Sequence, residues 1–374
     1  MRVDFHTKVP GDLDVRWIHG SPSARHNRDP ELQVHRYDEH TVILRQNMSV
    51  HYEAPFLYLL FGNDRALLVD TGATPEPELF PLRATVDRLL AGWLAAHPRD
   101  RYELLVAHSH SHSDHTAGDG QFADRPDTTV VGADQPAVTG FLGLREWPDG
   151  IAQVDLGNRV VDVIPSPGHD EPAVTYYDRS TGLMLTGDTL YPGRLYVFDW
   201  SAFTATVDRL LAFTEDHPVG HLLGAHIEMT RSPGVDYVIR TTYQPEEPPL
   251  ELSVADLRAL RRAIEEVGDT PGVHPYERFV STTACPTGTS VDPTRRWNRC
   301  RCWRPSVDTP SRSVLPSPSC KQGSSSGPRT SPGRRQRRRQ RKTGGRRTPR
   351  GFHPTAFGGR PDAQRVRARG GASV

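Results

Sequence analysis

The sequence predicts an α/β protein. Short apolar runs typical of β-strands alternate with segments of helical spacing over residues 1–282, and several of these runs lead directly into His or Asp. No run of about 18 apolar residues occurs, so a transmembrane span is not expected. The 374 residues, 36% of them hydrophobic, are enough for one large domain or two of ordinary size.

The first half of this region is predicted to hold three strands, a helix and a fourth strand. The three strands cover residues 41–45, 56–61 and 66–69. The helix covers 82–94, where apolar residues recur at helical spacing until Pro98 ends the pattern. The fourth strand, 104–107, runs directly into the sequence HSHSHSDH at 108–115.

The second half continues the alternation. Strands are predicted over 129–131, 160–164, 173–177 and 183–186, the last two joined by the hairpin-like turn DRSTG. Helical spacing follows over 203–213, and a strand begins at Leu222 and ends near His226. The final helix, 254–267, starts after Ser253, has Asp256 at a capping position and stops at Gly268.

A change in composition divides the chain. Residues 281–374 carry 22 Lys and Arg against 3 Asp and Glu, a net charge of +19, whereas residues 1–280 carry 24 against 42, a net charge of −18. We therefore predict a folded domain over 1–282 and a disordered tail over 283–374, rich in Arg, Pro, Gly and Ser. Such a tail either binds nucleic acid or another acidic partner, or is a product of GC-rich coding without a function.

Cysteine usage and the N-terminus bear on the compartment. The first 280 residues contain no cysteine, so a disulfide-stapled fold is excluded for them; the cysteines are Cys285, Cys300, Cys302 and Cys320. The N-terminal residues are charged from the start and lack the apolar stretch of a secretory signal. A cytoplasmic protein without membrane association is expected.

The segment His-Ser-His-Ser-Asp-His, residues 110–115, carries the most chemistry. Where a strand ends, residues two apart point to the same side, so His110 and His112 can offer imidazoles to one metal ion. Asp114 and His115 lie beyond the turn and face a second position. Imidazole and carboxylate groups are ligands that Zn²⁺ accepts. His108, which precedes the segment, is interpreted as lying outside the ligand set.

Three later residues complete a set of seven candidate metal ligands. His169 follows a predicted strand within PSPGHD, Asp188 leaves a strand within LTGDTLY, and His226 ends the strand of HLLGAH. Side chains at strand ends can meet at one edge of a sheet. Isolated histidines elsewhere are interpreted as structural: His51, His97 and His217.

The order H-x-H-x-D-H, then His, Asp and His, resembles the metallo-β-lactamase-fold hydrolase superfamily, whose pattern is matched at all seven positions. LLVDTG at 67–72 resembles the family's strand and turn, in which Asp70 would support the ligand loop from outside the ligand set. The resemblance covers about residues 40–230. It implies an αββα sandwich with the site at one edge of its two sheets.

The resemblance also implies a role for each candidate ligand. One zinc ion would be bound by His110, His112 and His169, a second by Asp114, His115 and His226, and both by Asp188. Iron or manganese would be accepted by the same ligands. A hydroxide held between the two ions would be the nucleophile. Asp114 would also orient this hydroxide and carry a proton to the leaving group.

Departures from other members of the superfamily narrow the predicted reaction. Asp188 disfavours a β-lactamase, His112 disfavours the oxygen-reducing di-iron members, and the spacing of the ligands is too short for the inserted domain of the nucleases. A hydrolase of a small-molecule ester, thioester or lactone remains. Thioester hydrolases of the glyoxalase II type share the ligand set and GDTL, whereas lactonases place a tyrosine where this chain has Tyr191.

Residues just after Asp188 are candidates for substrate contact, because a predicted loop there borders the site. They are Tyr191, Arg194 and Tyr196, and Arg194 would pair with one substrate carboxylate. The acidic body favours a neutral or modestly charged small molecule as the substrate.

Two alternative functions stay open: a nucleic-acid-associated phosphodiesterase or binder that uses the Arg-rich tail, and a metal-binding module without catalysis. The physiological substrate and the oligomeric state also stay open.

Overall fold

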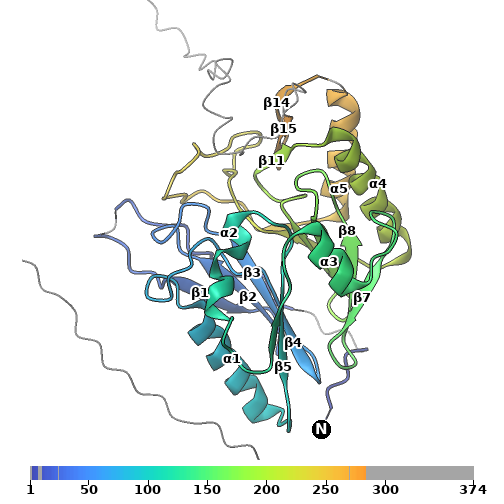
Figure 1. Cartoon of the computed structure of the whole chain (residues 1–374). Coiled ribbons are helices and arrows are strands. Elements are labelled where there is room, and N and C mark those ends of the chain that lie inside the picture. Colours follow the sequence, from blue (N-terminus) through green and yellow to red (C-terminus); the bar gives the residue numbers. More distant parts are fainter. Residues whose placement is uncertain (1, 7–10, 24, 269, 284–374) are drawn as a thin grey trace, which may run out of the picture. The chain divides into compact units, whose positions relative to one another are not determined.

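A computed structural model describes residues 2–6, 11–23, 25–268 and 270–283 (Figure 1). These residues form two six-stranded sheets and one three-stranded sheet. A bilayer-spanning helix is absent from the described residues. The predicted tail, apart from Thr283, lies outside them, and so does the hypothesis that the tail binds nucleic acid.

The first sheet follows the order of the chain. Its strands are β1 (Leu32–Arg36), β2 (Thr41–Gln46), β3 (Phe56–Phe61), β4 (Arg65–Val69), β5 (Glu103–Ala107) and β6 (Thr128–Val130). Neighbours are antiparallel up to β4, whereas β4, β5 and β6 run parallel. The long helix α1 (Leu82–Ala96) makes the connection from β4 to β5. The carboxyl ends of β4 and β5 therefore lie side by side.

The second sheet has the order β13-β12-β10-β9-β8-β7. Its strands are β7 (Ala152–Asp155), β8 (Val160–Pro165), β9 (Val174–Asp178), β10 (Leu183–Gly187), β12 (His221–Gly224) and β13 (Glu251–Leu252). Only β10 and β12 pair in parallel, connected through α4 (Trp200–Asp216). Helix α5 (Val254–Val267) contacts α4. The carboxyl ends of β10 and β12 are again neighbours.

The two large sheets pack face to face and carry helices on their outer faces. In β2, Ile43 joins the core between the sheets, while Val42 and Leu44 belong to the cluster that also contains the buried face of α1. In β10, Leu185 faces the shared core and Met184 packs in the cluster with α4 and α5. Strands buried on both faces explain the continuous apolar runs in the sequence. The predicted αββα sandwich is confirmed.

The structure adds elements that the sequence pattern did not predict. They are β1, β7, β13, α2 (Ser113–Thr116), the 3-10 helix η1 (Ala117–Gln121), α3 (Gln135–Leu142) and a small sheet of β11 (Arg194–Val197), β15 (Val280–Thr283) and β14 (Gly272–Pro275). The predicted loop after Asp188 is therefore wrong in part, because residues 194–197 form a strand. Its partner β15 is more than 80 residues away, a pairing invisible to local patterns.

Candidate metal centre

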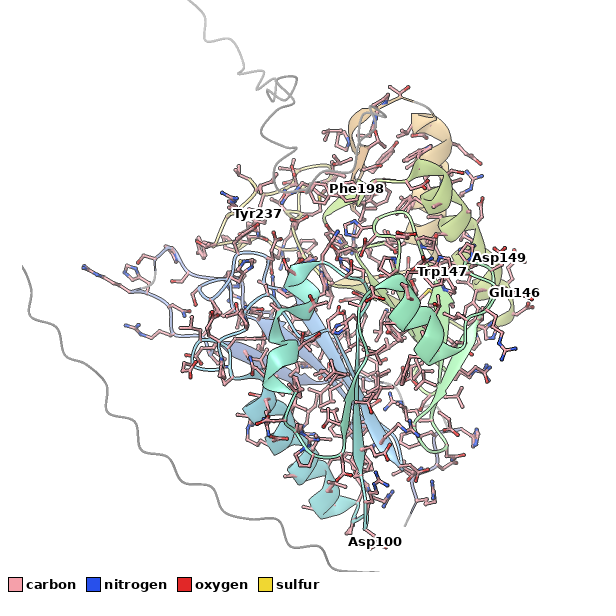
Figure 2. The ribbon with its side chains drawn as sticks, viewed as in Figure 1. Asp100, Glu146, Trp147, Asp149, Phe198 and Tyr237 are labelled. Atoms are coloured by element: carbon pink, nitrogen blue, oxygen red, sulfur yellow. The ribbon has the colours of Figure 1, made fainter. Side chains whose placement is uncertain are left out.

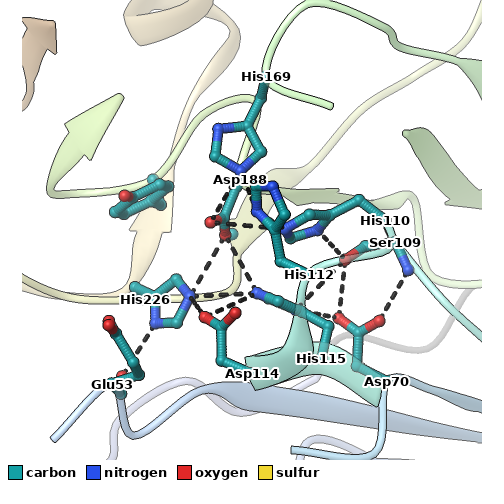
Figure 3. Close-up of polar contacts among 12 residues, drawn as sticks. Glu53, Asp70, Ser109, His110, His112, Asp114, His115, His169, Asp188 and His226 are labelled. Carbon is teal, nitrogen blue, oxygen red and sulfur yellow. Dashed lines mark hydrogen bonds and ion pairs between the residues drawn. The ribbon is translucent and has the colours of Figure 1, made fainter. Parts of the chain in front are cut away.

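The seven candidate ligands converge at one edge of the two large sheets (Figure 3). Each lies beyond the carboxyl end of a strand: β5 leads to the segment 110–115, β8 to His169, β10 to Asp188 and β12 to His226. Because β4 and β5 are parallel, and β10 and β12 are parallel, these ends meet at one edge of the sandwich. The topology assembles in space residues that are up to 116 positions apart in the sequence.

Three imidazoles form the first group. His110 Nε2 lies 3.1 Å from His112 Nδ1, and His169 Nε2 lies 3.0 Å from the same atom. His110 and His169 are buried and His112 is half-buried. Three ring nitrogens that converge at this distance are the donor set that a transition metal ion such as Zn²⁺ accepts.

A carboxylate and two imidazoles form the second group. Asp114 Oδ2 lies 3.3 Å from His115 Nε2 and 3.4 Å from His226 Nε2, and the two ring nitrogens are 3.3 Å apart. The short helix α2 carries Asp114 and His115 on one turn, and His110 and His112 precede it, so the segment 110–115 supplies ligands to both groups. This group offers one negative charge and two imidazoles to a second cation.

Asp188 lies between the two groups. Its Oδ2 is 3.5 Å from His169 Nε2 and 3.8 Å from His110 Nε2, whereas its Oδ1 is 3.4 Å from His226 Nε2 and 3.7 Å from His115 Nε2. Oδ1 is buried and has no hydrogen-bond partner among the described residues. Burial of a carboxylate oxygen without a hydrogen-bond donor costs free energy, and a cation bound beside the oxygen would offset that cost. One carboxylate with an oxygen toward each group fits a bridge between two cations.

Four of the five candidate histidines have their second ring nitrogen fixed by an oxygen atom. The partners are Ser109 Oγ for His110 (3.0 Å), Asp70 Oδ2 for His115 (2.9 Å), Tyr196 O for His169 (2.8 Å) and Glu53 O for His226 (2.9 Å). An acceptor at Nδ1 holds the proton there and leaves the Nε2 lone pair toward the centre. The rings are thus oriented before any ion binds.

Asp70 contacts the ligand segment from outside the ligand set. Its Oδ1 accepts from Ser109 N at 2.7 Å and its Oδ2 accepts from Ser109 Oγ at 2.8 Å, in addition to the bond from His115. Asp70 has a positive φ of 68°, a conformation rare outside glycine, directly after β4. This strained turn aims the carboxylate at the end of β5.

The electrostatics of the two groups differ. Burial by itself lowers the pKa of His226, yet the carboxylates of Asp188 and Asp114 raise it to about 9. Burial likewise opposes protonation of His115, but Asp114, Asp70 and Asp188 hold its pKa well above the ordinary value. The second group therefore attracts a cation.

In the first group, burial and the neighbouring imidazoles hold the pKa of His110 well below its ordinary value. Burial also lowers the pKa of His169. Neutral imidazole is the form that binds a metal ion. Together with the unpartnered Asp188 oxygen, the donor set of the centre fits two metal ions.

The three predicted substrate contacts are placed differently from expectation. Arg194 is buried and forms ion pairs with Glu228 (2.6 Å) and Asp236 (2.7 Å), so the predicted pairing of this guanidinium with a substrate carboxylate is wrong. Tyr191 is 2% exposed and its hydroxyl donates to the Arg194 carbonyl. The guanidinium of Arg194 and the hydroxyl of Tyr191 are buried, and two carboxylates balance the charge of Arg194. We therefore interpret these contacts as structural. Tyr196 is half-buried and accepts from Arg194 Nε at 3.2 Å, while its carbonyl orients His169.

Other histidines lie outside the centre. His217 stacks on Phe213 with ring centroids 3.8 Å apart, and His97 Nε2 lies 3.1 Å from Glu39 Oε1. His108 Nε2 lies 3.2 Å from Asp119 Oδ2, and His108 belongs to neither group. His51 is the exception, because its pKa, lowered by burial, also depends on the charges of Asp114 and His226.

Several residues near the centre were missed by the sequence reasoning. Phe198 lies beside His169 and His112, with ring centroids 5.8 Å and 6.4 Å away. Glu53 lies beside His226, and burial raises the pKa of its carboxyl to about 7. No local motif marks either residue, because each comes to the centre through tertiary packing.

The comparisons with known proteins identify the family. Residues 54–263, more than half of the chain, match the model of the metallo-beta-lactamase superfamily. The chain belongs to this superfamily, which confirms the resemblance inferred from the sequence. The match also supports the predicted class of enzyme, a hydrolase.

Two curated relatives and one solved structure illustrate the likeness. The hydroxyacylglutathione hydrolase of Rhizobium meliloti is 27% identical over 171 residues, which cover 44% of this chain and 62% of the relative. The acyl-coenzyme A thioesterase MBLAC2 of Gallus gallus is 26% identical over 210 residues, 46% of this chain and 72% of the relative. The DIM-1 metallo-beta-lactamase is 15% identical, with a TM-score of 0.44 over 65% of this chain and all of that structure.

Proposed function

We propose that this protein is a dizinc hydrolase of small-molecule thioesters. The observation that carries the proposal is Asp188, whose two oxygens face two separate groups of ligands. Both curated relatives are named for the hydrolysis of thioesters, in one case of glutathione and in the other of coenzyme A. The lactone alternative loses its support, because the hydroxyl of Tyr191 is buried against the Arg194 carbonyl.

The first group, His110, His112 and His169, and the second group, Asp114, His115 and His226, would each hold one ion, with Asp188 shared. Zinc is the first choice and iron or manganese the alternatives. The bound ions would supply a water activated at neutral pH and an electrophile for the carbonyl oxygen. Asp70, Ser109 and the carbonyls of Glu53 and Tyr196 keep the imidazoles oriented throughout.

Asp114 is suited to move the proton. Its side chain is 21% exposed, whereas Asp188 is 8% and Asp70 2% exposed, so Asp114 has the most solvent access of the three carboxylates. Hydrolysis adds the oxygen of water to the acyl carbon and breaks the carbon–sulfur bond. The proton released from water passes by Asp114 to the departing sulfur, giving a carboxylic acid and a thiol.

The test measures metal content and thioester hydrolysis in the full chain. We expect two metal ions per chain and chelator-sensitive release of free thiol from thioesters. His112→Ala and Asp188→Asn should each lose bound metal and on the order of a hundredfold in activity. His217→Gln is the matched control, because His217 stacks on Phe213 away from the centre.

Two outcomes would contradict the proposal. One is unchanged turnover in both ligand variants. The other is a metal-loaded wild type that leaves thioesters intact but cleaves a lactone or a phosphodiester, which would assign a different reaction to the same centre.

A further inference from the structure

An exposed aromatic ring stands at the first group of ligands. Phe198 is 47% exposed, although its ring contacts the imidazoles of His169 and His112. Phe198, labelled in Figure 2, follows β11 and precedes α4. Its backbone is fixed because Phe198 N donates to Gly168 O at 2.9 Å. A fixed, half-exposed phenyl ring next to the candidate ligands offers apolar surface to a substrate bound at the centre.

The positively charged side chain of Arg240 lies on the side of the second group. Arg240 is exposed, has a positive φ of 69°, and holds its guanidinium 5.9 Å from the Tyr52 ring centroid. The Tyr52 hydroxyl interacts with Arg240 and with the carboxylate of Glu53, whose carbonyl accepts from His226 Nδ1. Within the described part of the chain no carboxylate forms an ion pair with Arg240, in contrast to the neutralised Arg194. Its charge remains available to an anion.

The two sides can be assigned to the two halves of a thioester. The departing sulfur needs a proton, and Asp114 lies in the second group, 3.4 Å from His226 Nε2. The thiol half therefore leaves on the side of His226, Glu53 and Tyr52, which is also the side of Arg240. The acyl half is left on the side of His169 and Phe198.

We propose that the substrate lies across the centre with an apolar acyl group against Phe198 and an anionic thiol portion against Arg240 and Tyr52. The class is a thioester between an apolar acid and a thiol that carries carboxylate or phosphate groups. This inference rests on the proposed thioester hydrolysis. It adds the orientation of the substrate and the residues that select each half.

The experiment crosses two acyl groups with three thiols in the metal-loaded full chain. Acetyl and octanoyl thioesters of coenzyme A, of glutathione and of the neutral N-acetylcysteamine are compared for wild type, Phe198→Ala and Arg240→Gln. Arg240→Gln should raise KM about tenfold for an anionic thiol and less than about twofold for N-acetylcysteamine. Phe198→Ala should lower kcat/KM about tenfold for octanoyl and about twofold for acetyl thioesters. The coenzyme A and glutathione arms distinguish phosphate from carboxylate as the favoured anion.

Matched controls separate these effects from general changes. Phe141→Ala removes an equally exposed ring, 45%, that makes no ring contact with the seven candidate ligands in the structure as described. Arg258→Gln removes another exposed arginine, which lies on α5. Binding of an octyl thioether of coenzyme A, measured by calorimetry, should weaken in both test variants and in neither control.

The outcomes distinguish the two proposals. A wild type inactive on all six thioesters overturns the proposed function. An active wild type in which Arg240→Gln affects charged and neutral thiols equally, or Phe198→Ala affects both acyl groups equally, overturns the orientation and leaves the function standing. A loss with Arg258→Gln in place of Arg240→Gln would move the anion site to α5.

Discussion

The carboxylate of Asp70 ties together two segments of the centre: its Oδ2 accepts from His115 Nδ1 at 2.9 Å and its Oδ1 accepts from Ser109 N at 2.7 Å. One side chain at the end of β4 thereby orients a candidate ligand and fixes the backbone at the end of β5. Asp70 is buried, so these bonds are shielded from water. The geometry of the centre depends on a residue outside the ligand set.

Asp70→Asn should weaken metal binding while the fold is kept. The amide replaces one acceptor oxygen by a donor. Depending on its orientation, the variant loses either the bond from Ser109 N or the two bonds from His115 Nδ1 and Ser109 Oγ. We expect metal affinity to fall about 10- to 100-fold in a chelator competition titration, with an unchanged circular dichroism spectrum. Asp64→Asn, which loses only an exposed ion pair with Arg2, is the control. Unaltered affinity in Asp70→Asn would show that the ring of His115 needs no such support.

Metal affinity should rise with pH. The carboxylates of Asp188 and Asp114 overcome burial and raise the pKa of His226 to about 9, so the metal-free protein holds a proton there at neutral pH. A bound ion must displace that proton, and each proton released makes the affinity rise about tenfold per pH unit until the pH passes the pKa. Titrations at several pH values between 6.5 and 9, corrected for protonation of the competing chelator, measure this slope. A flat profile would exclude the displacement.

Gly187→Ala should disturb the centre more than the addition of one methyl group suggests. Gly187 has a φ of +50°, and a Cβ atom there would lie 2.7 Å from Ser109 Cβ. Either Asp188 or the Asp70-bound Ser109 must move, so bound metal should fall below two ions per chain in elemental analysis. Gly220→Ala serves as the comparison, because its nearest neighbour is a carbonyl at 3.8 Å. Full metal occupancy in Gly187→Ala would contradict this account.

Asp178→Asn should destabilise the fold without touching the centre. Asp178 pairs with Arg159 at 2.7 Å, and both side chains are almost wholly buried. Arg159 also donates to the carbonyls of His40, just before β2, and of Phe61 in β3. The variant leaves a buried guanidinium without its counter-charge. We expect the free energy of unfolding in urea to fall by about 3–5 kcal/mol. Asp149→Asn, at an exposed ion pair with Arg209, should cost less than about 1 kcal/mol.

Much of the fold was predictable because its signals are local. Strands buried on both faces appear as continuous apolar runs, and α5 has the predicted bounds of 254–267 because Ser253 and Asp256 form a capping box. Strand β11 was missed for the opposite reason. Its four residues gain their structure from β15, far along the chain, and the loop expected there gave the wrong environment for Arg194.

The identity and order of the seven candidate ligands can be read from the sequence alone, and the supporting role of Asp70 is predicted by the resemblance of that sequence to the superfamily. A metal site needs particular residue types at strand ends, and such a pattern can be read without coordinates. Only the tertiary structure decided that Asp188 faces both groups, that Arg194 is neutralised, that Phe198 lies beside His169, and that Arg240 lies over Tyr52. Distances, burial and charge pairing between remote segments are properties of packing, and packing leaves no local pattern in the sequence.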